Sequence, residues 1–325
     1  MVAAAVVTGN TVVMKPAEQT SLIAKLLMDA FTEAGAPAGL VNLLFGIGEE
    51  VGPTLVEHKD TTMICFTGSK PVGLSIIESA AKVQPGQTHI KRTITELGGK
   101  NAIIVDADAD LDEAVAGVAY SAFGFQGQKC SACSRLIVHE EAYDRVIERL
   151  VEVTKSLHLG PAHLASSTVG PVIDKEAQEK ILSYIKIGES EGTLAYQAPT
   201  PKEGCFVGPT IIKDLKASAR VANEEIFGPV LAVIKVKSFE EAIEVANNTE
   251  YALTGAVYSR SPANIDLAKK SFMVGNLYIN RGSTAALVDR HPFGGFKMSG
   301  AGSKTGGPDY LIQFMDPRVV TENTL

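Results

Sequence analysis

Strand-like apolar segments alternate with helix-like amphipathic segments along most of this chain, and this alternation most constrains its fold. In the first hundred residues the expected strands lie at 11–15, 41–46, 62–68 and 91–99, and the expected helices at 19–33, 49–58 and 70–82. The first of these helices carries an apolar face made of Leu22, Ile23, Leu26, Leu27 and Phe31. Strands and helices in alternation predict a helix-covered parallel sheet, and nearly continuous apolar strands predict burial on both faces. The fold class is therefore α/β.

A second series of the same kind begins at Asn101. Its expected strands lie at 101–106, 134–140, 209–213, 229–236, 252–258 and 275–280, and its expected helices at 112–123, after 140 through 157, at 174–188, 239–248 and 262–272. The Gly-rich run 294–307 predicts a long loop, and 310–320 an extended terminal arm. We therefore expect a first domain over 1–99, a second α/β domain over 100–297, and a terminal segment over 298–325.

Composition narrows the class of protein. The 325 residues suffice for about two domains, and a net charge of −7 without a basic run argues against a nucleic-acid partner. The longest apolar stretch is far below the ~20 residues that a membrane helix needs. The apolar start, MVAAAVVTGNTVV, lacks a positively charged region, so we interpret it as part of a core rather than as a signal peptide. Four cysteines give no disulfide framework, which agrees with a reducing, cytoplasmic location.

Two short motifs are typical of a nucleophile and its general base. Glu96 begins the glycine turn ELGG, and Cys130 follows 34 residues later in the polar loop GQKC. A cysteine reacts as its thiolate in a partly exposed, electropositive setting, and it needs a base that is near in space. The alternative for Cys130 is a small buried apolar residue. The alternative for Glu96 is a turn residue that is solvated or paired with Arg92.

Cys130 and Cys133 also form a C-x-x-C motif, which raises a redox or zinc interpretation. A structural zinc site uses four ligands, and no second cysteine pair or closely spaced histidine pair accompanies this one. A thioredoxin-like pair would begin a helix, whereas this pair precedes a predicted strand. The six histidines are scattered without metal-ligand spacing, so no metal site is expected.

The motifs ELGGK and GQKCSA resemble those of the aldehyde dehydrogenase superfamily. The longer strings FGFQGQKCSACSR and NRGSTAALVDRHPFGGFKMSG are similar to those of its branch that oxidises glutamate semialdehyde (1-pyrroline-5-carboxylate) to glutamate in proline degradation. The resemblance implies that the thiolate of Cys130 attacks the aldehyde, that hydride passes to NAD, and that Glu96 activates the water that hydrolyses the thioester. It also implies that 1–99 is the C-terminal half of an NAD-binding domain and that 100–297 is the catalytic domain.

The expected cofactor contacts also come from the resemblance. The dinucleotide fingerprint G-x-G-x-x-G is absent, because Gly46, Gly48 and Gly52 have the wrong final spacing. The alternative interpretation of these glycines is that they form turns. The family motifs instead imply that NAD is bound by the side chains of Lys15, Glu18, Ser69, Glu225 and Phe227. The alternative for EEIFGP is a buried pair of acids at a helix end.

The implied substrate contacts lie near the C-terminus: Ser283, Ala285, Ala286 and Phe293. The first three would hold the substrate's carboxylate, and Phe293 would contact its aliphatic chain. Ala285 stands where the family commonly has glycine. If that position requires positive φ, the alanine would strain the turn by about 1–2 kcal/mol.

One family motif is not found. The family completes its oxyanion hole with an asparagine from a W-N-x-P motif upstream of VMKPAE, and residues 1–14 do not contain it, since Asn10 matches another, structural position. We therefore expect an aldehyde dehydrogenase without its N-terminal portion. The alternatives are a dehydrogenase for another aldehyde and a non-catalytic fragment that binds a nucleotide. The terminal segment 298–325 implies a homo-oligomer, and the partners expected are a small aldehyde and other copies of the chain.

Overall fold

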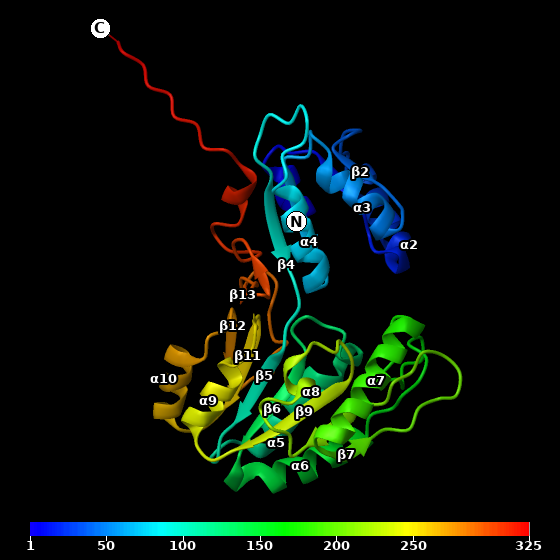
Figure 1. Cartoon of the computed structure of the whole chain (residues 1–325), viewed down its shortest axis with the longest axis vertical. Coiled ribbons are helices and arrows are strands. Elements are labelled where there is room, and N and C mark those ends of the chain that lie inside the picture. The colour runs from blue at the N-terminus through cyan, green and yellow to red at the C-terminus, as the bar shows by residue number, and fades with distance from the viewer. Residues whose placement is uncertain (325) are drawn as a thin grey trace. The chain divides into compact units, whose positions relative to one another are not determined.

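The computed structural model describes residues 1–324, which divide into two compact units. The first unit comprises Met1–Glu96, Val288–Phe293 and the residues from Ala301 onward, and the second comprises Leu97–Leu287 and Gly294–Gly300. Both units combine helices with parallel strands, so the predicted α/β class is confirmed (Figure 1). Within residues 1–324 no helix has the length and apolar character needed to cross a membrane.

The first unit contains two small sheets. In one, β1 (Val12–Met14) pairs in parallel with β2 (Val41–Leu43); in the other, β3 (Met63–Thr67) pairs in parallel with β4 (Arg92–Glu96), and β14 (Gly300–Ala301) flanks β4. The helical segments are α1 (Val2–Val7), η1 (Glu18–Thr20), α2 (Ser21–Glu33), α3 (Gly48–Glu57), α4 (Lys70–Ala80) and η3 (Leu311–Phe314). Parallel pairing was predicted correctly, but the strands of this unit form two small sheets where a parallel sheet was expected.

The burial predicted for these strands is also wrong. Strands β1 and β3 are only partly buried or exposed along their length. The helix predicted over 19–33 forms, but its apolar side chains Leu22, Ile23, Leu26 and Leu27 are 45–72% exposed. Helix α2 still packs against β2, but most of its apolar face is exposed to solvent. The buried cluster around Ile94 is correspondingly small and consists of Ala4, Ile94, Tyr310 and Phe314.

The C-terminal segment supplies half of that small core. An extended arm was expected over 310–320, but η3 forms within it and both Tyr310 and Phe314 are 5% exposed. Their rings contact each other edge to face, with centroids 5.4 Å apart. Burial of two aromatic rings favours a compact turn over an extended arm. Asn10 holds this turn, since its Nδ2 donates to the Phe314 carbonyl at 2.9 Å.

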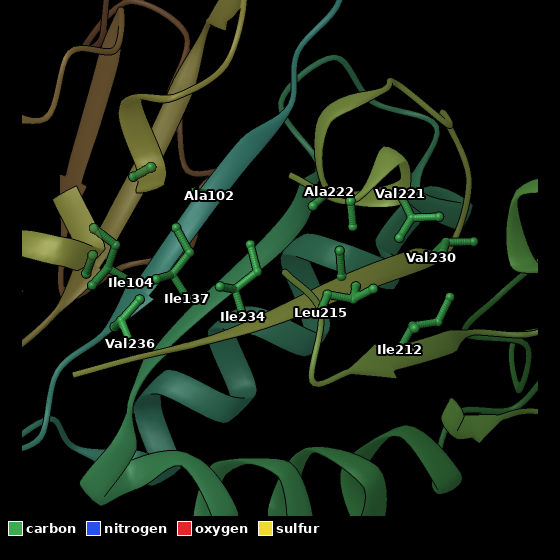
Figure 2. Close-up of a cluster of buried hydrophobic side chains, with 14 of the residues drawn as sticks. Ala102, Ile104, Ile137, Ile212, Leu215, Val221, Ala222, Val230, Ile234 and Val236 are labelled. Atoms are coloured by element: carbon green, nitrogen blue, oxygen red, sulfur yellow. The ribbon is translucent and has the colours of Figure 1, made fainter. Parts of the chain in front are cut away.

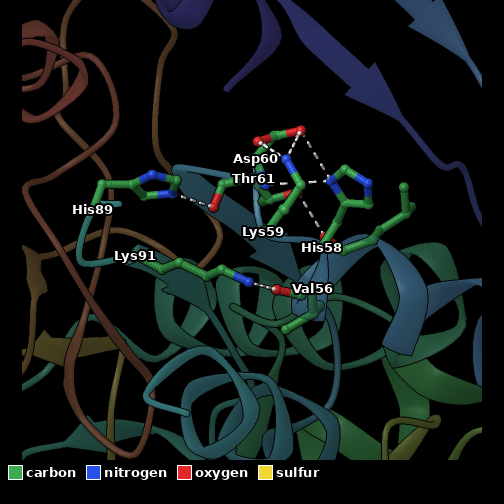
Figure 3. A network of polar contacts seen from close by, with 8 residues as sticks. Val56, His58, Lys59, Asp60, Thr61, His89 and Lys91 are labelled. Atoms are coloured by element: carbon green, nitrogen blue, oxygen red, sulfur yellow. Dashed lines mark hydrogen bonds and ion pairs between the residues drawn. The ribbon is translucent and has the colours of Figure 1, made fainter. Parts of the chain in front are cut away.

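Polar contacts secure the start of β4 (Figure 3). The Lys91 side chain is buried, and its Nζ donates to the carbonyl of Val56, in the last turn of α3, at 2.6 Å. A positive charge at a helix C-terminus is favoured by the helix dipole. A ring nitrogen of His89 contacts the Thr61 carbonyl at 3.0 Å. These contacts fix the entry to β4, the strand that ends at Glu96.

The second unit is built on one seven-stranded sheet. The strand order is β12-β11-β5-β6-β9-β8-β7, and every pairing is parallel except the edge pair β7–β8. The strands are β5 (Asn101–Val105), β6 (Cys133–His139), β7 (Thr193–Gln197), β8 (Thr210–Lys213), β9 (Val230–Val236), β11 (Thr254–Tyr258) and β12 (Asn276–Ile279). A separate antiparallel pair joins β10 (Tyr251–Ala252) to β13 (Phe296–Lys297), so the predicted glycine-rich loop contains short strands.

Helices cover both faces of this sheet. They are α5 (Leu111–Phe123), η2 (Gly124–Gly127), α6 (Glu140–Lys155), α7 (Lys175–Glu191), α8 (Arg220–Asn223), α9 (Phe239–Asn247) and α10 (Pro262–Ser271). Along β5, Ala102 and Ile104 pack in a core with α7 to α10, whereas Ile103 and Val105 pack in a second core with α5 and α6. Figure 2 shows part of the first core, including Ile137 from β6. Here the predicted burial on both faces is confirmed, because β5 and β11 are buried along their whole length.

Candidate functional site

Three sequence motifs meet at the amino edge of the large sheet. ELGGK leads into β5, GQKCSA into β6 and EEIFGP into β9. Strands β5, β6 and β9 are neighbours and run parallel, so the loops that precede them converge at one edge. Ligands of open α/β sheets commonly bind at the carboxyl ends of the strands. In this unit the candidate chemistry lies at the opposite end.

The two glycines of ELGG lie between Glu225 and the nucleophile loop. The Gly99 N–H donates to Glu225 Oε1 at 2.8 Å. A Cβ added at Gly98 would lie 2.3 Å from the Glu225 carboxylate, and one added at Gly99 would lie 2.5 Å from the Cys130 carbonyl oxygen. A side chain at Gly99 would clash with the backbone of the loop, and a side chain at Gly98 would displace the Glu225 carboxylate. Glycine at both positions therefore allows Glu225 and Cys130 to approach the turn from two sides.

Cys130 lies in a strained, partly exposed loop. The preceding residues Phe125, Gln126 and Gly127 all have positive φ, at 54°, 57° and 65°. Left-handed conformation is costly for residues other than glycine and is often found at functional sites. The Lys129 ammonium lies 5.7 Å from the centre of the Tyr120 ring and 5.9 Å from that of Phe125. The residue before Cys130 in the chain thus carries a positive charge that lies near two aromatic rings of the same region.

Cys133 has a different environment. It is 2% exposed as the first residue of β6, and burial raises the pKa of its thiol to about 12. Its Sγ contacts the Arg135 carbonyl at 3.4 Å. Cys133 starts a strand, as predicted, and not a helix. A buried protonated thiol is unsuited to redox exchange or metal binding.

Glu96 is the last residue of β4 and belongs to the first unit. Burial raises the pKa of its carboxyl to about 7, although the nearby positive charge of Lys304 acts in the opposite direction. The alternative partner Arg92 is instead paired with Asp316 at 3.0 Å. A carboxyl group with a pKa near neutrality can both accept and release protons at physiological pH.

The two acids of EEIFGP have separate partners. Glu224 accepts hydrogen bonds from Arg220 and Tyr184, which lower the pKa of its carboxyl to about 2. Glu225 turns toward the ELGG turn, as described above. Phe227 has φ of 60° and is 42% exposed. The motif thus places one acid in a surface ion pair and presents Glu225 and an exposed ring beside the nucleophile loop.

Three predicted cofactor residues lie in the first unit. Lys15 Nζ donates to Glu18 Oε1 at 3.1 Å and to the Gly46 carbonyl at 3.2 Å, and the Gly48 N–H donates to the same Glu18 oxygen at 2.7 Å. The sequence thus brings Lys15, Glu18 and the turn between β2 and α3 together. Ser69 is exposed at the start of α4 and provides no side-chain cap. In the first turn of α4, Pro71 has no backbone N–H, and the Ser69 side chain accepts no hydrogen bond from the others.

The predicted substrate residues are placed differently from one another. Ser283 is fully buried; its N–H donates to Ser121 Oγ at 3.1 Å and its Oγ donates to the Ser131 carbonyl at 3.1 Å. Ala286 is exposed, and Ala285 packs partly against the core. Ala285 is not among the residues with positive φ, so the strain considered for this alanine does not arise. Phe293 belongs to the first unit, where its backbone pairs with Thr305.

Three residues near the site were not singled out from the sequence. Asn101, the first residue of β5, donates to the carbonyls of Cys130 and Ala132. Arg135 is buried and donates to the Lys100 carbonyl at 2.9 Å. Lys100 itself is 1% exposed, and mainly its burial lowers the pKa of its ammonium to about 7. In the sequence, the signal that could have indicated these residues is their position as polar residues at the start of the apolar strands 101–105 and 133–139.

Comparison with known proteins gives a family and its relatives. Residues 1–320 match the sequence model of the aldehyde dehydrogenase family. The chain is 53% identical over 320 residues to 1-pyrroline-5-carboxylate dehydrogenase of Geobacillus thermodenitrificans and to 1-pyrroline-5-carboxylate dehydrogenase 2 of Bacillus subtilis. These matches cover 98% of this chain and 62% of each relative. The chain thus spans less than two thirds of the length of these relatives.

Solved structures of similar proteins match this chain along most or all of its length. A Thermus 1-pyrroline-5-carboxylate dehydrogenase with bound NAD is 51% identical, with a TM-score of 0.93 over 96% of this chain and 61% of that one. Proline utilization A from Bdellovibrio bacteriovorus is 60% identical, with a TM-score of 0.98 over 100% of this chain and 34% of that one.

Proposed function

Because this chain belongs to the aldehyde dehydrogenase family, we propose that it carries the catalytic part of an NAD-dependent dehydrogenase that oxidises glutamate semialdehyde to glutamate. The observation that carries the proposal is the ELGG turn, which lies between the Glu225 carboxylate and the Cys130 loop. Relatives named 1-pyrroline-5-carboxylate dehydrogenase support the choice of substrate.

Cys130 is the proposed nucleophile. Its thiolate adds to the aldehyde carbon, and the electron pair of the C=O bond moves to the oxygen, which accepts a hydrogen bond from the backbone N–H of Cys130. Glu225 and Phe227 would hold NAD, which would supply the hydride acceptor, and loss of hydride from the adduct would leave a thioester on Cys130. Glu96 then removes a proton from water, which attacks the thioester carbon and expels the thiolate. A Glu96 pKa of about 7 suits this step, because the carboxylate form is available at neutral pH.

We propose the NAD contacts separately for each unit. In the first unit, Lys15 and Glu18 contact the adenosine ribose, and Ser69 lies at the N-terminus of α4, which suits a phosphate group. In the second unit, Glu225 and Phe227 contact the nicotinamide ribose. The carboxylate of Glu18 disfavours a 2′-phosphate, so NAD should be preferred over NADP.

The remaining parts of the proposal concern substrate and assembly. Residues 283–286 hold the substrate carboxylate with backbone N–H groups, with Ser283 acting through its buried contacts rather than as a free hydroxyl. Phe293 contacts the aliphatic chain. Residues 298–325 assemble the protein with further copies of itself. Four cysteines outside any disulfide suit action in the cytoplasm.

Paired cysteine variants test the proposal. NADH formation from NAD and glutamate semialdehyde should be lost in Cys130→Ser and largely kept in Cys133→Ser, since Cys130 is partly exposed whereas Cys133 is buried. Iodoacetamide should label Cys130 before Cys65 and Cys205, which supplies a readout independent of turnover.

Equal loss from both serine variants would contradict the assignment of Cys130. Faster turnover of propanal than of glutamate semialdehyde would reject the proposed substrate and leave another aldehyde. The same assay with NADP measures the cofactor preference.

A further inference from the structure

Three consecutive backbone carbonyls of the nucleophile loop accept hydrogen bonds from buried side chains. Asn101 Nδ2 donates to the Cys130 and Ala132 carbonyl oxygens, each at 2.8 Å. The Ser131 carbonyl between them accepts from Ser283 Oγ at 3.1 Å and from Thr254 Oγ1 at 3.4 Å. The side of this loop that faces the sheet is therefore held at every residue from 130 to 132.

Asn101 is the centre of this arrangement. Its side chain is 3% exposed at the first position of β5, and its Oδ1 accepts from the Thr254 N–H at 3.0 Å. The pairing of β5 with β6 is irregular between Asn101 and Ala102, directly beside the loop. A carboxamide supplies the two N–H donors and the acceptor that these contacts use, whereas a carboxylate of the same shape has no donor.

Fixed carbonyls also fix the orientation of the loop. A peptide group is planar, so a carbonyl held in one direction determines the direction of the N–H that follows it. Rotation of these peptides would leave buried carbonyls without donors, which is unfavourable. The loop that carries the Cys130 thiol is thus held in a single arrangement from the side of the sheet.

We propose that Asn101 is a positioning residue that holds the Cys130 loop in the arrangement needed for attack on a carbonyl group. This inference rests on the proposed role of Cys130 as nucleophile. Ser283 supports the same loop from the turn proposed to bind the substrate carboxylate, so it connects that turn with the nucleophile.

Two reagents separate positioning from simple folding. With p-nitrophenyl acetate, the Cys130 sulfur forms a bond to the acetyl carbon, the ester C–O bond breaks and p-nitrophenolate leaves; the addition creates an oxyanion that needs oriented donors. With iodoacetamide, the sulfur displaces iodide and no oxyanion forms. In Asn101→Asp the acylation rate constant should fall by about 10- to 100-fold, while the alkylation rate stays nearly unchanged. Neither reaction uses NAD.

Asn247→Asp is the matched control. Asn247 Nδ2 donates to the Ser271 carbonyl at 2.7 Å and its Oδ1 accepts from the Met273 N–H at 2.8 Å. This variant therefore also loses an amide donor to a backbone carbonyl, but at a partly exposed position outside residues 128–133. It should leave the ratio of acylation to alkylation unchanged. If Asn101→Asp does not fold, Asn101→Ser, which keeps one donor and adds no charge, should lower the same ratio.

Unchanged ratios in the folded Asn101 variants would overturn the inference while leaving Cys130 as nucleophile. An equal fall of both rates would also overturn it, since that result indicates a general structural defect. If p-nitrophenyl acetate does not acylate Cys130 in the unmodified protein, the proposed function itself fails.

Discussion

Burial decides which single side chains change protonation near neutral pH. It raises the pKa of Glu96 to about 7 and that of Cys133 to about 12, and it lowers the pKa of Lys100 to about 7. A group whose pKa lies near the working pH can transfer protons in both directions. Of these three, Glu96 and Lys100 can do so, whereas Cys133 stays protonated.

The Glu96 pKa predicts a pH profile. Hydrolysis of a Cys130 acyl group should rise as pH increases through about 7, because only the carboxylate form of Glu96 accepts a proton from water. The rate of p-nitrophenolate release after the first turnover measures this step. In Glu96→Gln, hydrolysis of the acyl group should be slow and should not rise with pH through about 7. A rise of the same size in Glu96→Gln would show that another group is the base.

The same shift affects stability with a definite sign. The pKa of Glu96 in the folded protein lies above the ordinary value of 4.5, so the folded protein binds this proton more tightly than the unfolded chain does. Protonation of Glu96 therefore contributes fully to the free energy of unfolding below about pH 4.5, and this contribution is lost as the pH rises through about 7. In Glu96→Gln the free energy of unfolding should decline less over this range.

Ala285 tests whether the turn before PFGG prefers glycine. Because Ala285 lacks positive φ and packs against the core, Ala285→Gly should not relieve strain. It should instead lower the free energy of unfolding by about 0.5–1 kcal/mol, since glycine gains more conformational freedom on unfolding. Denaturant melts measure this effect. A more stable Ala285→Gly variant would mean that this alanine is strained after all.

At the scale of elements, the site is a set of loops that enter parallel strands. ELGGK, GQKCSA and EEIFGP each end where a strand begins, so their convergence follows from strand order and direction. The two glycines of the first loop make this convergence sterically feasible. The close approach, rather than a left-handed backbone, explains them, since neither Gly98 nor Gly99 has positive φ.

Alanine at Gly99 should therefore be destabilising. The added methyl group would meet the Cys130 carbonyl at 2.5 Å and the Asn101 amide at 2.9 Å, and such overpacking costs about 1–3 kcal/mol of unfolding free energy. Gly124→Ala is the control, because its Cβ would meet only Tyr120, at 3.9 Å or more. Thermal or urea melts compare the two. Equal stability of both variants would show that the loop can move away.

Local patterns predicted most elements within a few residues. Examples are the helices over 49–58 and 112–123 and the strands over 229–236 and 252–258. In such segments the apolar pattern of the segment itself indicates whether a helix or a strand forms. Strand β7 was missed because Thr193–Gln197 is a short, partly exposed edge strand. The turn at Leu311–Phe314 was missed because its burial depends on Ala4 and Ile94, which lie far away in sequence.

The candidate site was only partly predictable. Motifs and family resemblance identified the residues proposed for chemistry, and the family assignment is confirmed. They did not identify Asn101, whose three hydrogen bonds join segments at 101, 130–132 and 254. A single sequence does not reveal which backbone groups such a side chain will reach. The role of each proposed residue stays a prediction.

At the scale of the whole molecule, the two units differ in the size of their cores. The first unit has one small buried cluster, and α2 exposes several large apolar side chains. The second unit has two extended clusters, one on each face of a seven-stranded sheet. Since buried apolar area is the main source of stability, the first unit should open more readily.

Amide hydrogen exchange tests this difference. Amides of β3 and β4 should exchange faster than those of β5 and β9, because opening the first unit exposes less apolar surface. Limited proteolysis should cut within residues 1–96 first and leave a resistant product that includes most of 97–287. NAD, if it binds as proposed, should slow exchange in the first unit, since a ligand stabilises the state that binds it. Equal exchange in β3 and β5 without ligand would mean that the two units open together and that the small cluster around Ile94 is not an independent core.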